Sequence, residues 1–185
     1  MDRKIILSQQ QSDWIRSLSV VKKVRKHQYL LQEGDVCRQN IFISKGCLRS
    51  YSVDNNGIEH IIKFAIENWW IGDRHSLQSG EPSKLNIDAV EDSEAVLISK
   101  ADFDLICQQI PAFNAMVNNL LQSAYDASQK RVLANISLSA SEKYENFLQR
   151  YPDLALRLPQ GMIASYLGMS PETLSRVRNQ VMSRK

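Results

Sequence analysis

Hydrophobic and polar positions between residues 20 and 99 form short runs that are separated by turn-forming residues. The clearest pair is "CLRSYSV" and "IEHIIKFAI", joined by "DNNG". In the second run every other position from Ile58 to Ile66 falls on one side, as in a half-buried strand. Asn and Gly tolerate positive φ, so residues 54–57 are predicted to form a hairpin turn. Evenly spaced strands with such turns favour a sandwich or a rolled barrel over a βαβ fold.

After Ser99 the apolar spacing becomes helical. Ser99, with Asp102 three residues later, predicts the cap of a short helix. Pro111 suits the first turn of a second helix, where its missing N–H costs nothing. This second helix is expected to run from about residue 112 to 136, a stretch without Gly or Pro.

Apolar residues at three-four spacing form a seam along this second helix. This spacing favours pairing with a second copy of the chain, and burial within its own monomer is the alternative. The predicted dimer interface comprises Phe113, Val117, Leu120, Ala124, Ala127 and Arg131, and Ala134 continues the seam.

Two further helices are predicted in "QGMIASYLGMSPETLSRVRN", after a helix that begins near Ser139 and stops at Pro152. Gly168 permits the left-handed turn that ends the first of the two. Ser170 then caps the second, and Pro171 takes its first position. With apolar anchors at Leu174 and Val177, this spacing is typical of a helix-turn-helix.

The second of these helices keeps a polar face when its apolar anchors point inward. Arg is able to bind guanine O6 and N7 bidentately, Glu to accept from cytosine N4, and Ser to reach base edges or phosphates. Simple solvation of an outer helix is the alternative. The outward residues are Pro171, Glu172, Ser175, Arg176 and Asn179, with Arg178 beside them.

The charge distribution matters more than the total. The formal net charge is only +3, so a nucleic-acid role depends on where the basic residues lie. From residue 173 to 185 the chain carries Arg176, Arg178, Arg184 and Lys185 and no acidic residue. This local excess favours DNA binding by the C-terminal helices.

Several classes of protein are disfavoured. The N-terminus has too short an apolar run for a secretory signal, and the longest apolar stretch is too short for a membrane helix. We therefore expect a cytoplasmic protein with no membrane partner. No GxSxG, Walker or dinucleotide-binding pattern occurs, so the chain is not expected to be an enzyme.

No metal site or cofactor is predicted either. The three cysteines Cys37, Cys47 and Cys107 are scattered without a CxxC, which fits reduced thiols and excludes a four-thiolate cluster. The histidines are far apart and form no HxH, so a cupin-like metalloenzyme lacks its ligands.

The order of these parts closely resembles that of the Crp/Fnr superfamily, the cyclic-AMP receptor protein and its relatives. The resemblance covers nearly the whole chain and is carried by "YLLQEGDVCRQNIFISKGCLRSY", "WWIGD" and, most specifically, "GMIASYLGMSPETLSRV". It implies an α+β fold with a β-roll of the cyclic-nucleotide-binding type at residues 1–110. A dimerisation helix at 111–137 and a helix-turn-helix domain at 138–185 would follow.

For DNA binding, the resemblance implies that Glu172 and Arg176 contact bases, while Pro171 replaces a basic residue often found at its position. Ser170 and Thr173 match positions that approach phosphate, and Gln160 matches one at the start of the first helix. The predicted DNA contacts are therefore Gln160, Ser170, Pro171, Glu172, Thr173, Ser175, Arg176, Arg178 and Asn179.

For an effector, the resemblance points to a pocket but not to a nucleotide. Asp73, after Gly72, stands where nucleotide-binding members have a Glu, and Ser83 and Lys84 stand where an Arg-Ser pair meets the cyclic phosphate. Lys84 lacks the bidentate fork of Arg. The predicted pocket residues are Gly72, Asp73, Ser83, Lys84, Ser123 and Ser128, and their ligand is another small molecule or none.

The resemblance has a further departure at the C-terminus. "YPDLALRL" is short, and only seven residues follow Arg178, so the wing of many relatives is expected to be reduced or absent. Fewer phosphate contacts would then weaken non-specific DNA binding and its salt dependence.

Together these features predict a bacterial transcription regulator that binds a palindromic site on double-stranded DNA as a homodimer. RNA polymerase and an unidentified small effector are further candidate partners. The alternative function is a ligand-sensing adaptor that binds protein rather than DNA.

Overall fold

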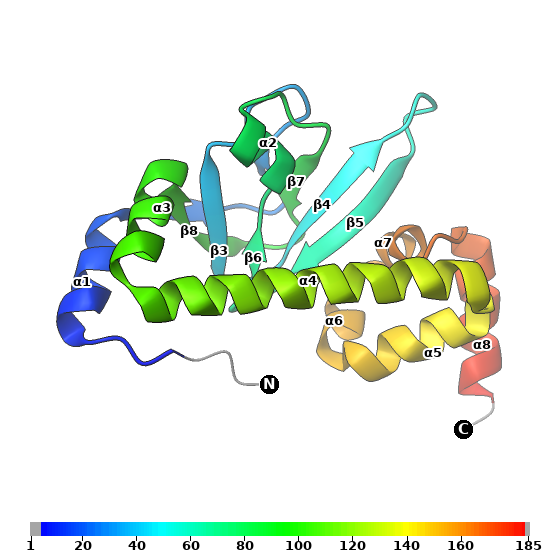
Figure 1. The fold of residues 1–185 in the computed structure, drawn as a ribbon. Coiled ribbons are helices and arrows are strands. Elements are labelled where there is room, and N and C mark those ends of the chain that lie inside the picture. Colours follow the sequence, from blue (N-terminus) through cyan, green and yellow to red (C-terminus); the bar gives the residue numbers. More distant parts are fainter. Residues whose placement is uncertain (1–4, 184–185) are drawn as a thin grey trace. The chain divides into compact units, whose positions relative to one another are not determined.

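The computed structural model describes residues 5–183, and the chain folds into two compact units. The first unit comprises residues 1–52 and 62–122, and the second comprises 53–61 and 123–185. Figure 1 shows the order of the helices and strands along the chain.

The first unit contains most of two four-stranded sheets. Their strand orders are β1-β8-β3-β6 and β2-β7-β4-β5, and β8 pairs antiparallel with β1 and β3, β6 with β3, and β7 with β2 and β4. This arrangement confirms the predicted α+β fold with a β-roll. The strands are β1 (Ser19–Val24), β2 (Tyr29–Leu31), β3 (Gln39–Lys45), β4 (Leu48–Val53), β5 (Glu59–Ala65), β6 (Trp70–Ile71), β7 (Asn86–Ala89) and β8 (Ser93–Ser99).

Strand alternation builds the core of this unit. Residues two apart point to the same face, so Ile41 and Ile43 of β3 and Ile87 and Ala89 of β7 meet in one buried apolar cluster. Gly46 ends β3 at φ 93°, and a Cβ there would overlap the side chain of Ser93. The turn therefore requires glycine.

A buried ion pair lies on the opposite face of β4 and β7. Arg49 donates from Nε to Oδ1 of Asp88 at 2.7 Å and from a terminal nitrogen to Oδ2 at 2.9 Å. Its guanidinium stacks over Tyr51 at 4.2 Å, and the Tyr51 hydroxyl lies 3.1 Å from that of Tyr29. Burial and then the Tyr29 hydrogen bond raise the pKa of Tyr51. The buried charge of Arg49 is thus paired and hydrogen-bonded within the protein, as a charge removed from water requires.

A second apolar cluster lies among three helices of the first unit, α1 (Gln9–Ser17), α3 (Lys100–Gln109) and the start of α4 (Pro111–Ser137). The remaining helix, α2 (Arg74–Ser79), contributes Leu77 to the cluster between the strands. Ser99 caps α3 as predicted, accepting from the backbone N–H of Asp102 at 3.1 Å. Phe103 of α3 packs edge-on against Trp70 and Phe113, with ring centroids 5.4 and 5.5 Å apart.

The second unit consists of the hairpin tip 53–61 and the helices from residue 123 onward. After α4, these are α5 (Ala140–Arg150), α6 (Pro152–Arg157), α7 (Gln160–Tyr166) and α8 (Pro171–Met182). Residues 138–183 contain no strand. The predicted turn at 54–57 is confirmed, because Asp54 N–H donates to the carbonyl of Ile58 at 3.0 Å and Gly57 has φ 79°.

The C-terminal helices begin and end at the signals in the sequence. Ser139 and Glu142 form a capping box at the start of α5. Pro152 follows the end of α5 and also occupies the first turn of α6, where its ring is tolerated. No helix in the described part of the chain combines the length and hydropathy needed to cross a membrane.

Candidate nucleic-acid interface and effector site

The predicted helix-turn-helix is formed by α7 and α8. Gly168, at φ 66°, makes the left-handed turn after α7, and Met169 N–H donates to the carbonyl of Ala164 at 3.0 Å. Ser170 caps α8 by accepting from Thr173 N–H at 3.2 Å, and Pro171 opens the helix. Gly168, Ser170 and Pro171 therefore form the turn, the cap and the first turn of α8 that the sequence predicts.

Apolar residues fix α8 against α5 and α7. Ile163 and Ala164 of α7 are fully buried, as is Leu174 of α8, and Val177 is nearly so. Val181 continues this face one turn later. Because the anchors lie on one side of α8, its opposite side is left to solvent.

The exposed side of α8 carries the polar residues that the sequence predicted. It includes Pro171, Glu172, Ser175, Arg176 and Asn179. Gln180 and Ser183 extend this face, and the seven residues line one shallow open depression. Sequence reasoning missed these last two, although continuing the helical period from Arg176 would have found them.

Two predicted contact residues are less exposed. Thr173 is half-buried, and its hydroxyl lies 3.2 Å from that of Ser170, within the helix cap. Arg178 is also half-buried, and its Nε is the one buried side-chain nitrogen or oxygen without a hydrogen-bond partner in the described part of the chain. Gln160, at the start of α7, is exposed.

The exposed face combines an anion with a cation one turn apart. A hydrogen bond from the Ser170 hydroxyl, and then one from its own backbone N–H, lower the pKa of Glu172, so its carboxylate is ionised at neutral pH. The positive end of the helix dipole also stabilises a carboxylate in the first turn. Arg176 lies four residues on and makes no ion pair with the described residues. The helix thus presents a strong acceptor and a bidentate donor, the chemistry that reads base edges.

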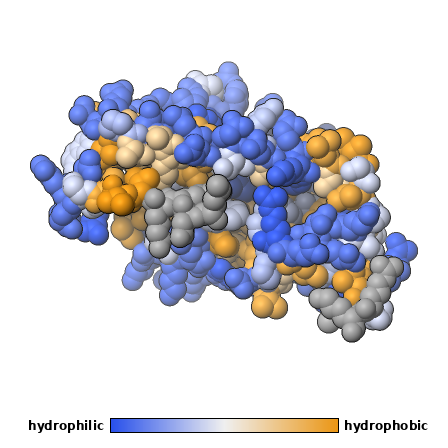
Figure 2. Space-filling model, turned by 60° about the horizontal axis from the view of Figure 1, so that its bottom comes forward, coloured by the Kyte–Doolittle hydropathy of each residue, from blue (hydrophilic) through white to orange (hydrophobic). Residues whose placement is uncertain are grey.

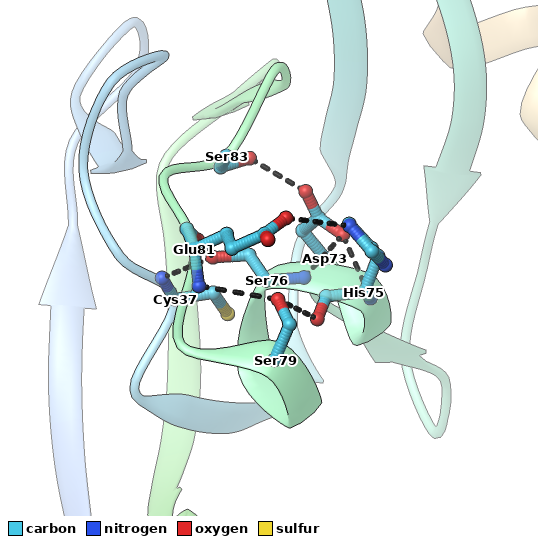
Figure 3. A network of polar contacts seen from close by, with 7 residues as sticks. All are labelled: Cys37, Asp73, His75, Ser76, Ser79, Glu81 and Ser83. Carbon is cyan, nitrogen blue, oxygen red and sulfur yellow. Dashed lines mark hydrogen bonds and ion pairs between the residues drawn. The ribbon is translucent and has the colours of Figure 1, made fainter.

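The predicted effector site is a cluster of polar residues around α2 in the first unit (Figure 3). Oδ1 of Asp73 caps α2 by accepting from the N–H groups of His75 and Ser76, at 3.0 and 3.2 Å. Its Oδ2 accepts from the Ser83 hydroxyl at 2.7 Å. The Ser76 hydroxyl donates to the carbonyl of Glu81 at 2.6 Å and accepts from Cys37 N–H at 2.9 Å.

These residues do not fit a cyclic phosphate. Ser83 is buried, and its hydroxyl is used by Asp73 and by the backbone of Leu85. The cluster holds two carboxylates, Asp73 and Glu81, and its histidine, His75, is already paired with Glu81 at 3.2 Å, whereas a phosphodiester needs cationic donors. Lys84 is exposed. The structure brings Gly72, Asp73 and Ser83 together but forms no anion site from them.

The remaining predicted pocket residues lie elsewhere in the chain. Ser123 and Ser128 are exposed positions on α4, in the second unit. Among the residues that the structure describes, no three His, Cys, Asp or Glu side chains are grouped to hold a metal ion.

The predicted dimer seam lies partly on the inner side of α4. Phe113 is buried, and Val117 packs against the same cluster. Leu120, Ala127 and Arg131 are half-buried, and only Ala124 of the predicted interface is exposed. Large apolar side chains are exposed on other faces of the helix, namely Tyr125, Val132, Leu133 and Ile136, which are 60, 50, 62 and 79% exposed. Figure 2 shows apolar patches among hydrophilic surface on the side that includes the lower part of Figure 1.

Comparison with known proteins adds an independent line of evidence. Residues 21–110 match the cyclic nucleotide-binding domain family. The regulatory protein HlyX of Actinobacillus pleuropneumoniae is 26% identical over 170 residues, covering 84% of this chain and 69% of the relative. The fumarate and nitrate reduction regulatory protein of Vibrio cholerae is 24% identical over 167 residues, covering 84% of this chain and 66% of that protein.

Solved structures share the fold. FixK2 from Bradyrhizobium japonicum matches with a TM-score of 0.78 at 19% identity, covering 90% of this chain and 85% of FixK2. The catabolite activator protein of Thermus thermophilus matches with a TM-score of 0.58 at 19% identity, covering 96% of this chain and 85% of the other.

Proposed function

The chain belongs to the Crp/Fnr superfamily of DNA-binding transcription regulators, and we propose that it reads a two-fold symmetric DNA site as a homodimer. The observation that carries this proposal is the exposed polar face of α8, with Glu172 and Arg176 one turn apart and the helix held by buried anchors behind them. A major groove admits an α-helix, and a helix with such a face discriminates base pairs there.

The residues of this face divide into two roles. Arg176 is assigned to a guanine and Glu172 to a cytosine amino group, with Ser175 and Asn179 beside them on the reading face. Gln160 and Ser170 are assigned to phosphates, because they stand where α7 and α8 begin and helix N-termini attract anions. Thr173 and Arg178, which are both half-buried, are assigned to the same contact with the phosphate backbone of the DNA.

The exposed apolar side chains of α4 support self-association. Tyr125, Val132 and Ile136 are spaced seven and four residues apart, which places them on one face of the helix. Pairing of this face with a second copy would remove it from water. It would also supply two recognition helices for half-sites about 10 base pairs, or 34 Å, apart.

DNA binding without a cyclic nucleotide is part of the proposal. It is supported by the hydrogen bond that the Ser83 hydroxyl donates to Asp73, because this bond uses the hydroxyl proton that would otherwise be available to a phosphodiester. An effector of another kind and a contact with RNA polymerase stay predictions, as does a cytoplasmic location.

The test is selection of bound duplexes from a random pool by the purified chain, without added nucleotide. A palindromic consensus is expected, and Arg176→Ala should weaken binding to it by about 1–3 kcal/mol. Arg16→Ala is the matched control, because Arg16 is an exposed arginine of α1 in the first unit. Failure of the unaltered chain to bind any duplex at low salt would favour the adaptor alternative.

A further inference from the structure

Ser165 of α7 makes two hydrogen bonds to the backbone of β5. Its hydroxyl donates to the carbonyl of Glu59 at 2.7 Å and accepts from Ile61 N–H at 2.9 Å. The three residues belong to the same compact unit, although more than 100 positions separate Ser165 from each of the other two. A serine hydroxyl is able to donate and accept at once, so one side chain satisfies both groups.

The two backbone groups lie on the outer edge of their sheet. β5 is the last strand in the order β2-β7-β4-β5. Ile58 accepts from Asp54 across the hairpin, so the groups of Glu59 and Ile61, at odd offsets from it, face away from β4. An unpaired edge is normally left to water or covered. Here the first helix of the helix-turn-helix covers it with a hydroxyl.

We infer that Ser165 is a positioning residue for DNA recognition, which clamps α7 to the hairpin 53–61 and thereby fixes the orientation of α8. The inference rests on the proposed function. Within the second unit, the helix-turn-helix is thus attached at two points, to the hairpin through Ser165 and to α4 through the chain. A helix held at two points has less orientational freedom to lose when it binds.

The clamp leaves the reading face free. Pro171, Glu172, Ser175, Arg176 and Asn179 are all exposed while Ser165 is bonded to β5. A contact that inhibited DNA binding by occlusion would cover some of them. The geometry therefore assigns to Ser165 a role in preparing the helix for DNA rather than in hiding it.

The first experiment measures the clamp itself. Amide hydrogen exchange of Ile61, resolved by NMR, is compared between the unaltered chain and Ser165→Ala. Loss of one hydrogen bond of about 1 kcal/mol predicts exchange about fivefold faster in the variant. Ser137→Ala is the matched control, since its hydroxyl bonds only to Leu133 within α4, at 2.8 Å. Unchanged exchange at Ile61 would overturn the clamp.

The second experiment measures positioning. Palindromes of the selected sequence are prepared with half-sites moved by one or two base pairs, together with a single half-site. We expect Ser165→Ala to bind the optimal palindrome at least about threefold more weakly, to bind the half-site equally, and to discriminate less against altered spacing. Ser165→Thr, which keeps the hydroxyl, should match the unaltered chain in palindrome affinity, half-site affinity and discrimination of spacing.

The outcomes separate the possible failures. Equal weakening on palindrome and half-site would indicate general destabilisation and would refute positioning, as would tighter binding by Ser165→Ala. Ser165→Cys, with its weak S–H donor, takes the place of the alanine variant if that variant does not fold. If the unaltered chain binds no DNA, the proposed function fails, and the exchange of Ile61 still decides whether the clamp exists.

Discussion

The polar cluster around α2 and the exposed face of α8 contain similar side chains that are used in opposite ways. Around α2, the Asp73 carboxylate and the Ser76 and Ser83 hydroxyls are each bonded within the protein. On α8, Ser175, Arg176 and Asn179 point to solvent. Polar groups that satisfy one another stabilise the fold, whereas those left to water are available for a partner. In the matched domain, Asp73, Ser76 and Ser83 accordingly hold the segment around α2 in place.

The largest expected effect concerns the buried ion pair, the extreme case of internally satisfied polar groups. Asp88→Ala should lower the free energy of unfolding by about 3–5 kcal/mol, because Arg49 keeps its charge in a buried place without its carboxylate. Urea unfolding followed by circular dichroism measures this. The double variant Arg49→Met, Asp88→Leu is the control and should be more stable than Asp88→Ala. A loss below about 1 kcal/mol in the single variant would contradict the assigned role.

The next effect separates stability from binding at α2. Asp73→Ala removes the cap of α2 and the partner of Ser83, and should lower the free energy of unfolding by about 1–3 kcal/mol. The affinity of the folded protein for its DNA site should not change. A double-mutant cycle with Ser83→Ala is expected to show coupling, since the two side chains share a hydrogen bond. Additive effects would mean that the bond contributes nothing.

The reverse pattern is expected on α8. Glu172→Gln should change the preferred base at one position of each half-site, with a loss of about 1 kcal/mol or more at the original base pair. Its free energy of unfolding should stay within about 0.5 kcal/mol of that of the unaltered chain, because the side chain is on the surface. Selection of duplexes by the variant gives the first result and urea unfolding the second. An unchanged consensus would remove Glu172 from the reading face.

The smallest effect is a pH dependence at the same carboxylate. The pKa of Glu172 is lowered in the folded chain, so its contribution to stability is present above the ordinary pKa of Glu, about 4.3. That contribution is lost as the pH falls through the lower folded value. Titration of the side chain by NMR measures the pKa directly, and Ser170→Ala should raise it towards the ordinary value. A normal pKa in the unaltered chain would show that the Ser170 bond is absent in solution.

Features encoded within a few residues were predictable from the sequence. The caps at Ser99, Ser139 and Ser170, the turn at 54–57 and the buried anchors Leu174 and Val177 each depend on spacings of four residues or fewer. The helix α1 was not predicted, although the sequence contains the same type of signal. Ser8 and Gln11 form a capping box at its start. These signals work because helix ends are satisfied by nearby side chains.

Features that join distant segments were not predictable. Arg49 and Asp88 are 39 positions apart, and no local spacing indicates that one strand register places them opposite each other. Asp73 and Ser83 were singled out as pocket residues, but their hydrogen bond to each other depends on how the chain returns after α2. Ser165 has nothing in its neighbourhood that points to a strand more than 100 positions earlier.

The second unit is built from two separate segments of the chain, which has a consequence for protein engineering. Residues 53–61 pack in one compact unit with the chain from 123 onward. A chimera that exchanges only the C-terminal helices would transplant Ser165 without the backbone that receives it. We therefore expect that grafting the DNA specificity of this regulator onto a relative needs two separate segments of the gene, one of them encoding a short hairpin far upstream.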